Sequence, residues 1–166
     1  MKTKILSAFS FAFVFAACAS DPLTGTWKQT AASVTVSGTP VITVDATVSF
    51  ASAGTFTATI VAYNPGTTTV FANATVSGTY THDESKTPNT FTLTTKSVTA
   101  KDATGASLQT TTNAAGATCY GVQTPVCIPQ TQTDDYSISG NTLTTSLQAT
   151  QPSFGNLSIS LTLTKQ

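Results

Sequence analysis

The feature that most constrains the fold of this chain is an alternation of apolar and polar side chains with a period of two. The clearest example covers residues 41–50, where one face consists of Ile42, Val44, Ala46, Val48 and Phe50 and the other of Val41, Thr43, Asp45, Thr47 and Ser49. Successive side chains of a β-strand point to opposite faces, so this period predicts strands with one buried face. The mature chain shows no helical periodicity of 3.6 residues.

Turn signals divide the alternating segments into about nine predicted strands. The strands are expected at residues 26–36, 41–50, 55–63, 67–81, 90–101, 107–112, 131–139, 142–150 and 157–165, with an irregular stretch at 113–130. The links at 51–54 and 64–66 have hairpin length and contain glycine or proline, which favours antiparallel pairing of consecutive strands. The predicted fold class is all-β: an antiparallel meander closed into an up-and-down β-barrel of eight or nine strands, with a β-sandwich as the alternative.

Charge is scarce in this chain, and its distribution excludes two classes of partner. Charged residues make up 8% of the sequence, against about 25% in ordinary soluble domains, and threonine takes much of their place. There is no arginine, and two of the seven lysines, Lys2 and Lys4, precede the predicted mature start, which leaves a net charge of −2. Such a surface offers no basic footprint for nucleic acid or for anionic lipid.

The first 17 residues have the pattern of a secretory signal peptide. A basic start is followed by an apolar run at 5–15, too short to span a bilayer, and then by small residues. Residues 15–18, Phe-Ala-Ala-Cys, resemble a bacterial lipobox, in which cleavage leaves a lipid-modified Cys18 as the first mature residue. Ala17-Cys18-Ala19 also fits a small-x-small signal-peptidase site, which would release a soluble periplasmic or secreted protein.

We therefore expect a signal peptide at 1–17, a short tether at 18–22 and a single barrel domain at 23–166. The membrane contact would be the lipid anchor on Cys18. By resemblance to lipoproteins of Gram-negative bacteria, alanine rather than aspartate after this cysteine implies an outer-membrane lipoprotein that faces the periplasm or the cell surface.

The two remaining cysteines, Cys119 and Cys127, are expected to form a disulfide. An exported protein meets an oxidising compartment, in which paired cysteines are usually joined. The seven intervening residues make the spacing too long for a redox Cys-x-x-Cys motif, and no histidine lies nearby to complete a metal site. The pair is therefore interpreted as structural.

Gly25-Thr26-Trp27 at the start of the meander resembles the opening motif of the lipocalin-like (calycin) barrels, especially small bacterial lipocalin-like lipoproteins. The segments 54–57, 78–80 and 136–143 resemble later strands and the penultimate hairpin of that family. In lipocalins the motif tryptophan packs at the closed end of the barrel beneath an arginine from the last strand. The resemblance implies that Gly25 and Trp27 close this barrel, with Lys165 over Trp27 in a cation–π contact worth about 1 kcal/mol.

The predicted barrel interior is a candidate site for a small apolar ligand. An eight-stranded barrel is just wide enough to be filled by side chains or to hold one small ligand. The candidate lining consists of Val48, Phe50, Phe56, Ala58, Ala72, Ala74, Tyr80, Phe91 and Tyr136. The alternative is an envelope lipoprotein with a structural, inhibitory or partner-binding role. Its core would be filled by side chains, and its loop at 113–130, which holds the predicted disulfide, would face the partner.

The charged clusters do not predict catalysis, a metal site or a cofactor. His82, Asp83 and Glu84 are consecutive in a polar loop, which is typical of a solvated turn. Asp134 and Asp135 are adjacent in a predicted strand, so their side chains point to opposite faces and do not cooperate as acid and base. One of the two is expected to be exposed and the other to lie near the mouth of the barrel. We expect a monomer that is not an enzyme.

Overall fold

The computed structural model describes residues 21–36, 39–64, 66–112, 116–120, 126–151 and 155–166. The predicted signal peptide at 1–17 and Cys18 lie outside the described residues. Within these ranges the chain forms eleven strands: β1 (Gly25–Val36), β2 (Thr39–Ala51), β3 (Thr55–Tyr63), β4 (Val70–Asp83), β5 (Asn89–Asp102), β6 (Thr110–Thr112), β7 (Thr118–Tyr120), β8 (Val126–Ile128), β9 (Thr131–Ser139), β10 (Thr142–Gln151) and β11 (Gly155–Lys165). None of the described residues forms a helix long and apolar enough to cross a membrane.

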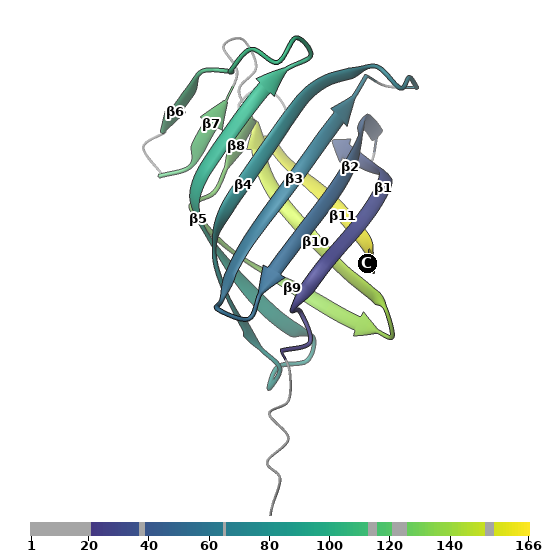
Figure 1. The fold of residues 1–166 in the computed structure, drawn as a ribbon, viewed down its shortest axis with the longest axis vertical. Coiled ribbons are helices and arrows are strands. Elements are labelled where there is room, and N and C mark those ends of the chain that lie inside the picture. The colour runs from purple at the N-terminus through teal and green to yellow at the C-terminus, as the bar shows by residue number, and fades with distance from the viewer. Residues whose placement is uncertain (1–20, 37–38, 65, 113–115, 121–125, 152–154) are drawn as a thin grey trace, which may run out of the picture.

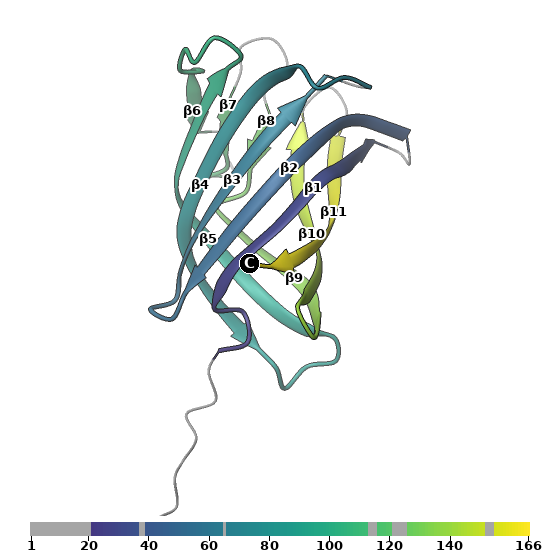
Figure 2. The ribbon, with the colours of Figure 1, turned by 45° about the vertical axis from the view of Figure 1, so that its right-hand side comes forward.

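Eight of these strands close into an antiparallel up-and-down barrel (Figures 1 and 2). The order around the wall is β1-β2-β3-β4-β5-β9-β10-β11, and β11 pairs with both β10 and β1. The wall is continuous because Trp27 and Lys28 at the start of β1 pair with Lys165 and Thr164 at the end of β11. The predicted barrel is confirmed, and the alternative of a β-sandwich is wrong.

The three short strands β6, β7 and β8 form an extension beside the barrel, between β5 and β9 in the chain (Figure 1). The sequence predicts an irregular stretch at 113–130, and this prediction is wrong for β7 and β8, which pair as a hairpin. Their three-residue length gives no alternation that a sequence pattern can reveal. A single register pair, Thr150 with Cys127, connects the extension to β10.

The barrel has two distinct ends. At the end that we call the closed end, β1 and β5 begin and β4, β9 and β11 finish, and the segment 21–24 runs beneath the strands (Figure 1). At the opposite end, which we call the far end, β5 finishes and the β6–β8 extension follows. β9 accompanies β5 only from Asn89 to Thr94, so the wall between β5 and β10 is continued toward the far end by the extension.

A bulge in β1 adapts that strand to the curvature of the wall. The register of β1 with β2 shifts between Gln29 and Ala32, and Ala31 has a φ of 55°. The amide of Ala31 donates to Oδ1 of Asp45 at 2.8 Å, and Oε1 of Gln29 accepts from the amide of Thr162 at 2.6 Å. Bulges bend a strand and increase its twist, which a closing barrel requires.

Candidate functional site

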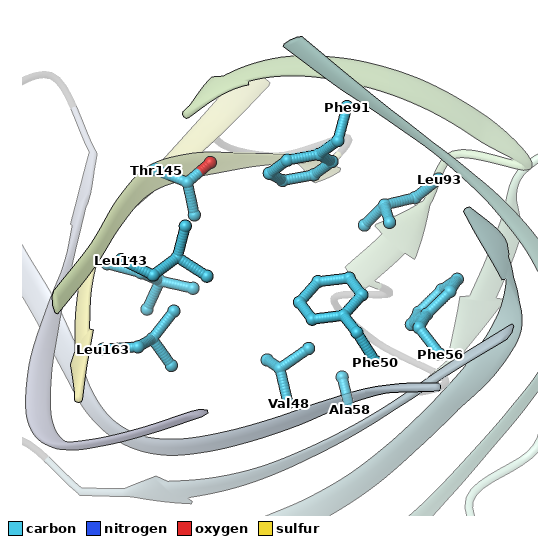
Figure 3. A pocket seen from close by; sticks show the side chains of 10 residues that line it. Val48, Phe50, Phe56, Ala58, Phe91, Leu93, Leu143, Thr145 and Leu163 are labelled. Carbon is cyan, nitrogen blue, oxygen red and sulfur yellow. The ribbon is translucent and has the colours of Figure 1, made fainter. Parts of the chain in front are cut away.

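The alternation of the strands carries apolar side chains into the barrel, where they surround a cavity of about 30 Å³, measured as the space open to the centre of a water-sized sphere. Its walls come from β2, β3, β5, β10 and β11 (Figure 3). The lining residues are Val48, Phe50, Phe56, Ala58, Phe91, Leu93, Leu143, Thr145, Leu161 and Leu163. In Figure 3 the labelled side chains point toward one another across the barrel.

The cavity presents hydrocarbon to its interior. Nine of the ten lining residues are apolar. The exception is Thr145, which is 8% exposed and whose Oγ1 donates to the carbonyl oxygen of Asp135 at 2.8 Å. Because that hydroxyl is already paired, the lining favours an apolar group over water, which needs two to four polar partners.

Five of the nine residues predicted to line a cavity do so: Val48, Phe50, Phe56, Ala58 and Phe91. Leu93, Leu143, Thr145, Leu161 and Leu163 complete the lining. The signal for the additional residues is the same alternation, since they share inward positions with their neighbours two residues away. The alternation does not predict the position of each side chain along the barrel axis, because that position depends on the register between strands.

The other four predicted lining residues lie elsewhere in the interior. Ala72 and Ala74 of β4 lie toward the far end, where Ala74 pairs with Ala100 of β5 and is 6% exposed. Tyr80 and Tyr136 are buried at the closed end and frame the aromatic cluster there. The ring of Tyr80 packs edge-on against Phe50 with centroids 4.8 Å apart, and Tyr136 lies 5.7 Å from Phe91.

Gly25, Trp27 and Lys165 meet at the closed end. Trp27 is completely buried, and Nζ of Lys165 lies 5.2 Å from the centroid of its ring. Gly25 has a φ of 132°, and a Cβ added there would lie 2.8 Å from Cε of Lys165. The absence of a Cβ at this glycine therefore lets the side chain of Lys165 pass close to the backbone of β1 and reach the indole ring.

The segment from Asp21 to Thr24, which spans the end of the predicted tether and the start of the predicted barrel domain, covers the closed end. Leu23 is completely buried in the core, and its carbonyl oxygen accepts a hydrogen bond from Nε1 of Trp27 at 2.7 Å. Oδ1 of Asp21 accepts from the amide of Leu23 at 2.9 Å, and Oδ2 accepts from the hydroxyl of Tyr80 on β4. Burial, and then this carboxylate, raise the pKa of Tyr80 to about 12.

His82 belongs to β4 rather than to the polar loop that the sequence predicts. The strand extends to Asp83 because it pairs with β5 as far as Thr90. Nδ1 of His82 lies 3.7 Å from Oδ1 of Asp21, and Nε2 lies 4.0 Å from Oε1 of Glu84. Within the described part of the chain, no group of three histidine, cysteine or acidic side chains is arranged to hold a metal ion.

The two adjacent aspartates of β9 lie on opposite faces, as the alternation predicts. Asp135 is exposed, whereas Asp134 is buried inside the barrel and is 6% exposed. The prediction that the inward carboxylate lies near the barrel mouth is wrong. Asp134 is in register with Phe91, close to the start of β5 and therefore nearer the closed end, because β9 joins β5 only there.

The pKa of Asp134 is raised to about 6, mainly by burial and to a smaller extent by the charge of Asp135, while a hydrogen bond with Gln132 acts in the opposite direction. Oδ2 of Asp134 has no hydrogen-bond partner among the residues that the structure describes. A buried acceptor without a partner costs about 1–3 kcal/mol. Among the described residues, the hydroxyl oxygens of Thr24 and Tyr136 are also buried without a partner, but Asp134 is the acidic group of this set.

The predicted disulfide is confirmed: Cys119 of β7 and Cys127 of β8 are joined and face each other in register. Both cysteines are buried, together with Ala117, in a small cluster separate from the main core. The bond therefore fixes the hairpin of the extension rather than the barrel itself.

No protein-family model and no curated protein matches this chain. The fold and the geometry of its interior therefore carry the functional interpretation.

Proposed function

We propose that this protein binds a small, slender apolar molecule inside its barrel. The observation that carries the proposal is the apolar cavity inside the barrel, lined among others by Phe50, Phe91 and Leu163. Carbon atoms that line an empty space lose dispersion contacts on one side, and an apolar guest restores them. The proposal assigns the chain to binding rather than to catalysis.

The dimensions of the cavity limit the kind of ligand. The volume open to the centre of a water-sized sphere is about 30 Å³. Such a cavity admits the end of a narrow alkyl chain but not a wide ring system. A longer guest has to displace side chains, which costs energy in a closely packed interior. We therefore expect unbranched alkyl compounds to bind better than bulky polycyclic ones.

Filling the cavity is the sharpest test of this proposal. Ala58→Leu places a larger side chain at a buried lining position, whereas Thr57→Leu makes a comparable change at the exposed neighbouring position of β3. Binding of 1-octanol, measured by isothermal titration calorimetry, is expected for wild type and Thr57→Leu and should be lost in Ala58→Leu. No heat of binding with wild-type protein that circular dichroism shows to be folded would contradict the proposal.

We further propose that the chain is an exported, lipocalin-like lipoprotein anchored by Cys18 in the outer membrane, with a soluble exported form as the alternative. An eight-stranded barrel is compatible with a lipocalin-like protein, and disulfides such as Cys119–Cys127 persist in oxidising compartments. Metabolic labelling with palmitate in a Gram-negative host tests the anchor. Label is expected on wild type and not on Cys18→Ser, and an unlabelled wild-type protein would exclude the lipid.

A second candidate function is recognition of an envelope protein through the β6–β8 extension. The supporting observation is that, among the strands of the described ranges, β6 stands at the end of the strand order, pairs with β7 alone and is exposed at all three residues. A free strand edge offers unpaired backbone groups to another chain. If pull-downs from envelope extracts return no reproducible partner, this candidate fails.

A further inference from the structure

Asp134 places a carboxylate where hydrocarbon would be expected. It lies between Gln132 and Tyr136 on the inward face of β9, and it is 6% exposed. Oδ2 has no hydrogen-bond partner in the described part of the molecule. A charge taken out of water without a partner is costly, so such groups are usually paired or bound to a ligand.

The position of Asp134 connects it with the cavity. Its register partner on β5 is Phe91, and residues in such a pair have Cβ atoms about 5 Å apart. Leu93, two residues further along β5, is its diagonal neighbour, and both of these β5 residues line the cavity. On the other side of β9, Tyr136 pairs with Thr145, which is also a lining residue. Asp134 is not itself one of the lining residues, but its neighbours in the sheet are, so its carboxylate lies next to the wall of the apolar space.

None of the lysines that the structure describes supplies a counter-charge inside the barrel. All five are exposed: Lys28, Lys86, Lys96, Lys101 and Lys165. The nearest ionisable group along the chain is Asp135, which has the same sign and points outward. Gln132 supplies one hydrogen bond to Asp134, and a ligand is left as the source of the compensating charge.

We infer that Asp134 binds the protonated amino group of an apolar amine whose hydrocarbon part occupies the barrel cavity. This inference rests on the proposed function and narrows it to one class of ligand. An ammonium group supplies both the hydrogen-bond donors and the charge that Oδ2 lacks. A hydroxyl group supplies the donor alone, and a carboxylate is repelled.

The protonation states agree with this pairing at neutral pH. With a pKa of about 6, Asp134 is mostly ionised at pH 7.5 even without a ligand. An alkylammonium resembles a lysine side chain, whose ordinary pKa is about 10.4, and is protonated at the same pH. The two groups therefore meet as opposite charges in a site from which water is largely excluded.

The test compares three ligands that have the same eight-carbon chain: octylamine, 1-octanol and octanoate. Their binding to the full mature chain is measured by isothermal titration calorimetry at pH 7.5. We expect octylamine to bind about tenfold or more tightly than 1-octanol, because a charge-assisted hydrogen bond is stronger than a neutral one. Octanoate is expected to bind most weakly.

Two matched variants separate the local contact from the overall charge of the protein. Asp134→Asn removes the buried charge at nearly constant volume, and Asp135→Asn removes the same charge from the exposed face of the same strand. The preference for the amine should disappear in Asp134→Asn and persist in Asp135→Asn. Circular dichroism establishes that both variants are folded.

The outcomes distinguish this inference from the proposed function. If wild type binds octylamine no better than 1-octanol, or if both variants retain the preference, the inference is overturned while alkyl binding stands. Equal loss of the preference in both variants would assign it to net charge and would also overturn the inference. If none of the three compounds binds to wild type, the proposed function fails as well.

Discussion

At the closed end of the barrel the interior is filled by large aromatic side chains, whereas toward the far end the buried inward positions of the described strands are mostly alanine and valine, with isoleucines only partly buried beside them. The closed end holds Trp27, Phe50, Phe91, Tyr80 and Tyr136, and these residues are at most 5% exposed. Toward the far end the corresponding buried positions are Val34, Val44, Ala62, Ala74 and Ala100. Eight strands define one barrel, yet its two halves exclude water with side chains of different size.

Polar contacts differ between the halves in the same way. At the closed end the segment 21–24 connects β1 with β4, because Trp27 donates to the Leu23 carbonyl and Tyr80 donates to Asp21. Toward the far end β9 no longer separates β5 from β10, and a hairpin held by the Cys119–Cys127 disulfide follows instead. We therefore expect the closed end to contribute more to stability than the far end.

The largest effect is expected from removing the side chain that fills the closed end. Trp27→Ala deletes a completely buried ring and should lower the free energy of unfolding by about 3–5 kcal/mol. Val44→Ala, at a position 2% exposed toward the far end, should cost about 1.5 kcal/mol for the two lost methyl groups. Urea denaturation followed by circular dichroism measures both. Equal losses would remove the distinction between the two ends.

Asp134 lies nearer the closed end and should make stability depend on pH. Its pKa is about 6 in the folded protein and its ordinary value is 3.8, so the folded state retains a proton that the unfolded chain has already lost. Stability therefore falls as the pH rises from about 4 to about 6, and the cost is fully present above that range.

The matched variant Asp134→Asn does not titrate and should be the more stable protein at pH 7. The shift in pKa corresponds to a difference of up to about 3 kcal/mol, which should vanish near pH 3.5. Urea denaturation of both proteins at several pH values measures the difference, with Asp135→Asn as the exposed control. A difference that does not change with pH would refute this assignment of the buried charge.

Removing the disulfide tests whether the closed end of the barrel keeps its structure when the β6–β8 extension at the far end is weakened. Replacing Cys119 and Cys127 by serine frees a short loop and should lower the free energy of unfolding by about 2 kcal/mol, mainly by giving freedom back to the unfolded chain. The near-ultraviolet circular dichroism of the aromatic cluster should be retained, because that cluster lies at the closed end. Loss of this signal in the folded variant would mean that the two ends are not independent.

The smallest expected effect concerns the contact between Lys165 and Trp27. A double-mutant cycle with Trp27→Phe and Lys165→Met should show a coupling free energy of about 1 kcal/mol for the cation–π interaction. Both substitutions retain an apolar side chain, so the cycle isolates the charge and the ring. Independent effects of the two substitutions would assign closure to β1–β11 pairing alone.

Alternation along the strands was sufficient to predict the barrel and much of its interior. The period of two identifies which side chains of β2, β3 and β11 point inward, because that direction is fixed within each strand by the geometry of the backbone. The same rule separates Asp134 from Asp135. The disulfide followed from the number of cysteines, and the proximity of Trp27 and Lys165 followed from the family resemblance.

The tertiary structure alone decided which inward side chains meet. The register between β5 and β9 places Asp134 beside Phe91 and the cavity instead of at the mouth of the barrel. The segment 21–24 at the closed end and the β7–β8 hairpin depend on contacts between segments distant in sequence. A local pattern specifies the face of a strand, but the height of a residue and the partners of a buried charge depend on long-range pairing, which has no local signal.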